Sequence, residues 1–373
     1  MKRVLVYAYL AGNLGDDLLV TILCHRYPKV EFHMLAEERY KQRFAALSNA
    51  VIHTPGDALV QEKGQWMEKH RHQKANGFLM WMASQCYATV HIGGSVFVQH
   101  QDDFSAAYQT DADLCRYSKR LYVVGANFGP YTDPDYYRRY HALFARYRGI
   151  CFRDQPSYDK FQDLPRVRWA PDVAFAYRPA DPLPSSEKTV VISVLDLEHR
   201  GGKYSICQHQ AGYEANLAAL GDLLVEQGYK VVLVSFCEMQ GDETAAQRIQ
   251  GAMKQGSSPQ VEILAYQDDL QPVLDAFAKA DRVVATRFHS IVLGWLYDKP
   301  VLPIVYDLKC TQLLEDNHQD YLTLEQWCQA DPKQLLGQLL ERPGFDSKEL
   351  REQAQEQFAF TDRALNSRLG LFG

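Results

Sequence analysis

Residues 281–305 read DRVVATRFHSIVLGWLYDKPVLPIV, and this stretch decides the fold. Its β-branched runs predict strands at 282–286 and 301–305, and the apolar residues between them predict a helix at 289–297. A strand, a helix and a second strand in this order form a unit whose two strands run parallel. The stretch therefore predicts a parallel sheet covered by helices.

The same alternation extends from this stretch to both ends of the chain. In the second half we predict further strands near 189–195, 230–235 and 261–264, with helices near 212–228, 242–254 and 269–280. In the first half we predict strands near 3–9, 30–35, 88–92, 121–126 and 149–152, and a helix at about 16–26. The polar segment 61–78 is expected to be an exposed loop or helix face. Alternating strands and helices are typical of α/β domains with parallel sheets.

A proline- and serine-rich window at 177–188 divides these two series of elements and predicts an extended linker. We therefore predict two doubly wound, Rossmann-like α/β domains, at 1–180 and 189–345, with a cleft between them. Residues 346–373 are expected to form a C-terminal helix that crosses back to the first domain.

Composition excludes several classes of protein. The 373 residues include 40 Lys and Arg against 46 Asp and Glu, so the net charge of −6 disfavours broad nucleic-acid binding. No apolar run approaches the ~18 residues that a membrane-spanning helix needs, and the polar residues from Gly12 onward argue against a signal peptide. The 8 cysteines form no C-x-x-C pair, which favours free thiols and a cytoplasmic protein.

Ligands of open α/β sheets bind beyond the C-terminal ends of the strands, so the residues that follow each predicted strand are the candidates. The first strand is followed by Gly-Asn-Leu-Gly-Asp-Asp at 12–17. We expect Asn13, Gly15 and Asp16 to contact substrate hydroxyls, because glycine allows close approach and a helix begins there. The alternative is that the aspartates only cap that helix.

Two further turns of the first half would face the same cleft. Gly93, Gly94 and Ser95 follow the strand at 88–92, and Asn127 follows the strand at 121–126. We assign these four residues to substrate binding, with ordinary strand-to-helix turns as the alternative.

Arg153 follows the strand at 149–152, where a guanidinium group can bind an anion through two hydrogen bonds. An ion pair with Asp154 is the competing interpretation.

The opening stretch carries the most informative candidates. Arg287 and His289 follow a strand and begin a helix, so a fixed cation, a titratable imidazole and a helix N-terminus meet at one point. This combination predicts an anion site with its own proton donor, and a purely structural role is the alternative. Phe288 and Ser290 belong to the same turn and are assigned to substrate binding.

Two other residues complete the predicted site. Lys309 follows the strand at 301–305 and adds a cation. Glu238 follows the strand at 230–235 and can accept a hydrogen bond from a sugar hydroxyl. No metal site is predicted, because the His-x-His at 70–72 lacks a third ligand.

Taken together and in order, these motifs resemble the polysaccharide pyruvyl transferase family. The matching residues span about 8 to 316 and are Gly12–Asp17, Gly93-Gly94, Gly125–Pro130, Phe152-Arg153-Asp154, Gly228–Cys237, Asp242, Arg287-Phe288-His289 and Tyr306–Lys309. The sequence departs from the family pattern at Ser95, where a third glycine is common. It also departs at 193–196, where Ser-Val-Leu-Asp stands in place of an arginine that is often found there.

The resemblance implies a fold similar to the GT-B glycosyltransferases, with the acceptor on the first domain and the donor on the second. It implies transfer from phosphoenolpyruvate, with no cofactor, to two hydroxyls of one sugar in a cell-surface polysaccharide or its precursor. The product would be a pyruvate ketal. The family motifs fall on Arg153, Arg287 and His289, which are therefore the expected catalytic residues.

Other interpretations stay open at this point. A GT-B-like glycosyltransferase that uses a nucleotide sugar is the first alternative, and a saccharide-binding protein without activity is the second. The acceptor is a free, nucleotide-linked or lipid-linked saccharide. A lipid-linked acceptor would bring the protein to the inner face of the membrane as a peripheral contact, and a homodimer is also left open.

Overall fold

The computed structural model describes residues 1–179, 188–198 and 205–366, which fall into two compact units. Unit 1 consists of 1–10, 16–176 and the C-terminal segment from 352, and unit 2 consists of 11–15 and 177–351. The predicted linker falls largely on 180–187, which lies outside the described residues, as do 199–204 and 367–373. Residues 11–15, the loop after the first strand and the start of the first helix, thus group with unit 2.

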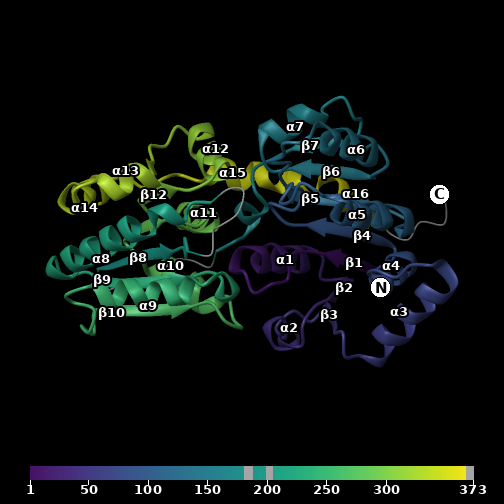
Figure 1. Cartoon of the computed structure of the whole chain (residues 1–373), viewed down its shortest axis with the longest axis horizontal. Helices are drawn as coiled ribbons and strands as arrows, with labels where there is room; N and C mark the ends of the chain where they lie inside the picture. The colour runs from purple at the N-terminus through teal and green to yellow at the C-terminus, as the bar shows by residue number, and fades with distance from the viewer. Residues whose placement is uncertain (180–187, 199–204, 367–373) are drawn as a thin grey trace. The chain divides into compact units, whose positions relative to one another are not determined.

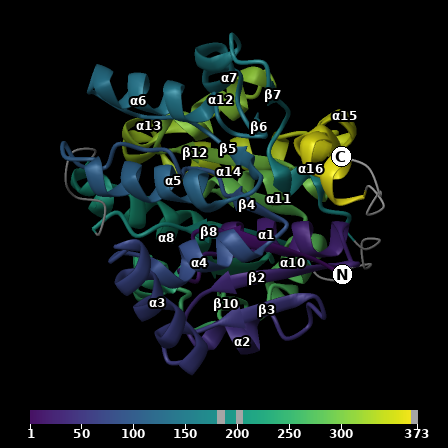
Figure 2. The ribbon, with the colours of Figure 1, turned by 90° about the vertical axis from the view of Figure 1, so that its right-hand side faces the viewer.

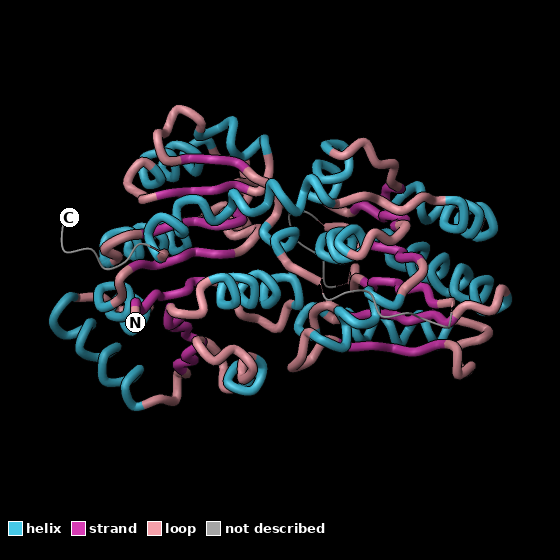
Figure 3. Tube along the Cα trace, turned by 180° about the vertical axis from the view of Figure 1, so that it is seen from behind, coloured by secondary structure: helices cyan, strands magenta, loops and turns pink. Residues whose placement is uncertain are grey.

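The strands of unit 1 form one parallel sheet in the order β3-β2-β1-β4-β5-β6-β7. Their bounds are β1 Lys2–Tyr7, β2 Val30–Leu35, β3 Ala50–His53, β4 Ala88–Ile92, β5 Leu121–Ala126, β6 Gly149–Phe152 and β7 Val167–Trp169. The helices are α1 Leu14–Arg26, α2 Arg39–Arg43, α3 Ala58–Arg71, α4 Gly77–Gln85, α5 Ser105–Tyr117, α6 Pro134–Phe144, α7 Gln155–Phe161 and α16 Ala359–Leu365, with 3-10 turns η1 Val173–Ala176 and η5 Ala354–Phe358. Helices flank the strands, as Figures 1 and 3 show.

Unit 2 repeats the design with the strand order β10-β9-β8-β11-β12-β13, again all parallel. The strands are β8 Thr189–Val194, β9 Lys230–Ser235, β10 Val261–Ala265, β11 Arg282–Ala285, β12 Val301–Val305 and β13 Leu322–Thr323. The helices are α8 Gln210–Glu226, α9 Asp242–Ala252, α10 Gln271–Lys279, α11 Phe288–Leu296, α12 Leu308–Asp316, α13 Leu324–Gln329, α14 Pro332–Glu341 and α15 Lys348–Gln353, with 3-10 turns η3 Cys207–His209 and η4 Glu238–Gln240.

Burial explains why the central strands were predictable. Every residue of β8 and of β12 is buried, and strands covered on both faces appear as continuous apolar runs. The structure adds three short strands that we did not predict: β3, β7 and β13. The segment 61–78, which we expected to be an exposed loop or helix face, covers most of α3, a non-helical connection at 72–76 and the start of α4.

The strand orders locate the point in each sheet where ligands bind. In unit 1 the order reverses between β1 and β4, and in unit 2 it reverses between β8 and β11. Doubly wound sheets bind ligands outside the C-terminal strand ends at this reversal. The loop 8–13 and Gly93 follow β1 and β4, whereas Asp196 and Arg287 lie just beyond β8 and β11.

The C-terminal segment is anchored on unit 1, where η5 and α16 lie beside β5 and β6 (Figures 1 and 2). The side chain of Gln357 is buried and accepts a hydrogen bond from Gly125 N at 2.9 Å. Its amide nitrogen donates to the carbonyl oxygens of Phe152 at 3.0 Å and Ala170 at 2.6 Å. One side chain thus joins the C-terminal segment to β5, to β6 and to the residue after β7. Among the described residues, no helix combines the length and the apolar character that crossing a membrane requires.

We expect Gln357→Ala to lower the free energy of unfolding by about 3 kcal/mol, because it leaves buried backbone groups of β5 and β6 without partners. The measurement is urea unfolding followed by circular dichroism. The matched control is Gln162→Ala, whose side chain is exposed and makes one local bond. Equal unfolding midpoints for the two variants would contradict the anchoring role.

Candidate functional site

Hydrogen bonds to two buried hydroxyl groups hold the turn after β11 in place. Ser193 Oγ accepts hydrogen bonds from Thr286 N at 2.9 Å and from Arg287 N at 3.2 Å. Ser290 Oγ donates to Arg287 O at 2.6 Å and lies 2.7 Å from Ser193 Oγ. Because each hydroxyl has one proton, Ser193 donates its own to Ser290. Ser290, which we predicted to bind substrate, is fully buried and positions the Arg287 backbone.

The guanidinium group of Arg287 is held by two side chains of the neighbouring turn after β9. It forms an ion pair with the Asp242 carboxylate and donates a hydrogen bond to Gln240 Oε1 at 2.6 Å. Arg287 is 5% exposed and Asp242 is 0% exposed. Burial by itself would lower the pKa of Arg287, but Asp242, together with Tyr306 and Cys237, opposes burial and the pKa is raised overall. The cation is therefore permanent and fixed in direction.

Asp242 is in turn oriented by backbone groups. Its Oδ1 accepts a hydrogen bond from Asp196 N at 3.2 Å, and its Oδ2 accepts from Phe236 N at 3.3 Å and Cys237 N at 3.1 Å. A carboxylate with these partners is compensated for its removal from water. The ends of β8, β9 and β11 are consequently linked through one buried carboxylate.

The loop 11–15 belongs to this part of unit 2 and meets His289. Leu14 N donates to Phe236 O at 3.0 Å, and Asn13 forms an antiparallel bridge with Cys237. A Cβ on Gly15 would lie 1.8 Å from His289 Nδ1, so only glycine leaves room for the imidazole there. His289 is partly exposed, and the Phe288 ring packs edge-on against it with centroids 5.2 Å apart. The structure thus brings together Asn13, Gly15, Arg287 and His289.

Unit 1 contains a second fixed arginine at the C-terminal edge of its sheet. The Arg153 guanidinium donates to Asp172 Oδ2 at 2.9 Å, to Asn127 Oδ1 at 2.6 Å and to Ser95 Oγ at 3.3 Å. These partners follow β7, β5 and β4. A Cβ on Gly94 would lie 2.2 Å from Arg153 Nη1, so Gly94 also makes room for a charged side chain.

Asp154 does not take part in this pairing. It caps α7 by accepting from Ser157 N at 2.7 Å, so the Arg153–Asp154 ion pair considered above is replaced by Arg153–Asp172.

The structure also places the other predicted residues. Gly93 has φ +153° in the turn after β4. Asp16 lies in the first turn of α1 and Glu238 begins the exposed turn η4. Lys309 Nζ lies 3.0 Å from Asp307 Oδ2. Burial alone would raise the pKa of Asp307, but Lys309 and the Cys310 N–H oppose burial, and the pKa is lowered overall.

Asp172 and Gln240 were missed by the sequence analysis, although Gln240 sits in the turn after a predicted strand. Among the described residues, no group of three His, Cys, Asp or Glu side chains is arranged to hold a metal ion.

Solved structures share the fold of this chain. The UDP co-structure of MnaA from S. aureus superimposes with a TM-score of 0.58 at 12% identity and covers 100% of both chains. A putative UDP-N-acetylglucosamine 2-epimerase from Listeria monocytogenes also gives 0.58, at 10% identity over 97% of this chain and 94% of its own. The predicted fold class, doubly wound Rossmann-like α/β domains similar to the GT-B group, is confirmed.

The sequence comparison defines the family. The family model "Polysaccharide pyruvyl transferase" matches residues 13–307, and the chain therefore belongs to this family. The amylovoran biosynthesis protein AmsJ of Erwinia amylovora is 23% identical over 363 residues, which cover 83% of this chain and 84% of AmsJ. The protein is thus a polysaccharide-modifying transferase, and the predicted family resemblance is confirmed.

We expect Gly15→Ala to displace the His289 ring, because the added methyl group and Nδ1 cannot occupy the same space. Alanine normally stabilises a helix relative to glycine by up to about 1 kcal/mol. We expect Gly15→Ala to lower the stability of the protein instead, because of the clash with His289. The measurement is the histidine NMR spectrum together with thermal unfolding.

The matched control is Gly337→Ala in α14, where a Cβ would meet nothing within 4 Å. This variant should keep the His289 signals and the melting temperature, or raise the latter. Unchanged His289 signals in Gly15→Ala would contradict the close approach.

Proposed function

We propose that this protein transfers the enolpyruvyl-derived group of phosphoenolpyruvate to two hydroxyls of one sugar and forms a cyclic pyruvate ketal. The acceptor is a sugar of a cell-surface polysaccharide or of its precursor. The observation that carries the proposal is that a fixed cation, Arg287, and the imidazole of a half-buried residue, His289, lie two positions apart at the sheet reversal of unit 2.

The proposed reaction balances without a cofactor. Two C–O bonds form between C2 of the donor and the two sugar oxygens, and the bond between C2 and the phosphate oxygen breaks. The two sugar hydroxyl groups lose two protons. One of them balances the proton that the methylene carbon takes up when it becomes a methyl group. The other leaves with inorganic phosphate. No oxidant or reductant is needed.

The residues of unit 2 suit the donor. Phosphoenolpyruvate carries a carboxylate and a phosphate, and a guanidinium group pairs with either one through parallel hydrogen bonds. His289 as imidazolium supplies the proton at the methylene carbon, which makes C2 electrophilic. The start of α11 adds the partial positive charge of a helix N-terminus beside it.

In unit 1 we assign Arg153 to an anionic group of a substrate, with its direction fixed by Asp172 and Asn127. Asp16 and Glu238 are proposed to accept hydrogen bonds from sugar hydroxyls, and Asn13 is proposed to accept or donate one. The acceptor is a free, nucleotide-linked or lipid-linked saccharide.

The main alternative, a glycosyltransferase that uses a nucleotide sugar, predicts a different ligand. Calorimetric titration with phosphoenolpyruvate and with a panel of nucleotide sugars separates the two. Under the pyruvyl transfer proposal, phosphoenolpyruvate binds in the absence of any nucleotide. Binding of a nucleotide sugar as the glycosyl donor, with none of phosphoenolpyruvate, would replace the proposal with the alternative.

Substitutions of His289 and of Arg287 should impair different steps, the first turnover and the second donor binding. His289→Asn should retain phosphoenolpyruvate binding within about threefold but lower phosphate release by a factor on the order of 10² or more, because general acid catalysis is lost. Arg287→Lys should instead raise the dissociation constant by about tenfold or more, because an ammonium group lacks the planar fork. Binding is measured by calorimetry and turnover by phosphate release with acceptor present.

The control for the histidine is His141→Asn, which removes an imidazole from α6 that pairs with Asp163 at 2.9 Å. It should leave binding and turnover unchanged. Full turnover in His289→Asn would refute the proton-donor role, and the donor assignment would then depend on the Arg287 result alone.

A further inference from the structure

A cluster of arginines lies at the edge of unit 1 where the strands begin. Arg120, Arg148 and Arg166 are the residues directly before β5, β6 and β7. These strands are neighbours in one parallel sheet, and adjacent strands are about 4.8 Å apart. The three side chains therefore start side by side, at the edge of the sheet opposite to the one that carries Arg153.

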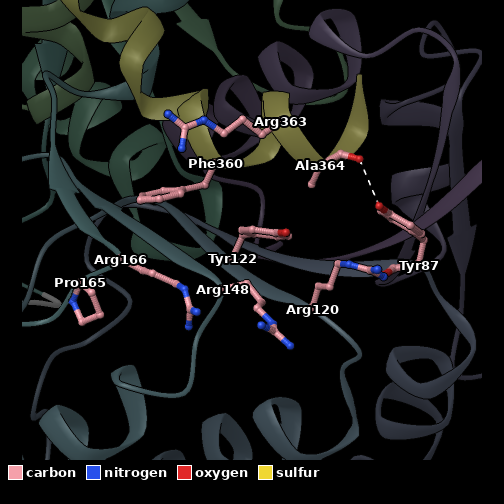
Figure 4. Close-up of a pocket in the computed structure, with 9 residues that line it drawn as sticks. All are labelled: Tyr87, Arg120, Tyr122, Arg148, Pro165, Arg166, Phe360, Arg363 and Ala364. Carbon is pink, nitrogen blue, oxygen red and sulfur yellow. Dashed lines mark hydrogen bonds between the residues drawn. The ribbon is translucent and has the colours of Figure 1, made fainter. Parts of the chain in front are cut away.

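These arginines line a cavity of about 430 Å³ that α16 borders. Arg363 and Phe360 of α16 line its far side, and Tyr122 of β5 lies between them and the strand-start arginines (Figure 4). Tyr87 also lines it and donates a hydrogen bond to Ala364 O at 3.3 Å. The cavity is thus formed by β-sheet residues on one side and by the C-terminal helix on the other.

The cavity has no negative charge of its own among the described residues. Its lining holds no Asp or Glu, and none of its four arginines forms an ion pair with a described carboxylate. Arg120 instead donates to Tyr87 O at 3.3 Å and packs over the Tyr87 ring. Lys2 is close enough that Arg120 contributes to lowering the pKa of Lys2, after the larger effect of burial.

Several other arginines of unit 1 are neutralised by carboxylates, in contrast to the arginines of the cavity. Arg138 and Arg139 both pair with Asp135, and Arg168 pairs with Glu356 at 2.8 Å. Four guanidinium groups around one cavity repel one another unless an anion lies between them. Burial raises the pKa of Tyr122, but Arg120, Arg148 and Arg166 all oppose that rise, so their positive potential reaches the inside of the cavity.

We propose that this cavity binds a phosphate-bearing group, either of a soluble phosphorylated compound or of an anionic lipid headgroup. Arginine is the side chain best suited to phosphate, because its planar fork matches two phosphate oxygens. All described residues that line the cavity belong to unit 1 and come from the strand-start edge of the sheet or from α16, so the cavity is separate from the residues assigned to pyruvyl transfer.

The test compares two double variants that remove equal charge. Arg148→Gln with Arg166→Gln changes two exposed residues of the cavity, whereas Arg116→Gln with Arg138→Gln changes two exposed arginines of α5 and α6 outside it. Each protein is titrated with inorganic pyrophosphate by calorimetry. Each is also sedimented with phosphatidylglycerol vesicles and with phosphatidylcholine vesicles at several salt concentrations.

We expect the cavity variant to lose at least about fivefold in affinity for one anionic probe, and the control variant to match the unchanged protein. Binding should weaken as salt rises, because the site is partly exposed. Loss of pyrophosphate binding identifies a soluble ligand, and loss of phosphatidylglycerol binding alone identifies a headgroup. Equal losses in both double variants, or no binding of either probe by the unchanged protein, would overturn the proposal.

Discussion

The buried ion pair between Arg287 and Asp242 is the interaction on which the candidate site depends. Each group is almost completely removed from water, and breaking such a pair from one side costs roughly 3–5 kcal/mol. Because backbone N–H groups after β8 and β9 hold the carboxylate, the direction of the guanidinium follows from the sheet itself. Under the proposed function, the arginine therefore presents a guanidinium group of fixed orientation to a substrate anion instead of a large net charge.

Unit 1 uses the same arrangement with different residues. Arg153 is held by Asp172, which follows a strand of its own sheet and is 2% exposed. In both units a glycine also leaves space for a side chain of the candidate site: Gly94 for Arg153 and Gly15 for His289. Glycine is thus required at these two positions because a larger residue would clash with the neighbouring side chain. Neither Gly94 nor Gly15 needs a positive φ.

The sequence was informative where burial or topology imposes a simple rule. Strands covered on both faces produce apolar runs, and residues after parallel strands gather at one edge, which placed Arg287 and Arg153 correctly. The sequence did not predict β7, because none of its three residues is buried. Asp172, which follows this strand, was therefore missed as well. Partners such as Asp242, which lies 45 positions from Arg287, depend on tertiary structure that no local pattern encodes. The predicted cleft, the cytoplasmic location and the homodimer stay predictions.

The most direct test of this account is the affinity for phosphoenolpyruvate of Asp242→Asn, measured by calorimetry beside the unchanged protein. Coulomb's law alone predicts tighter binding, because a negative charge next to Arg287 is removed. The account predicts the opposite, with affinity weaker by about tenfold or more, equivalent to ~1.4 kcal/mol, because the guanidinium loses the partner that orients it. Unchanged or tighter binding in a variant with a native circular dichroism spectrum would contradict the claim that orientation dominates at this site.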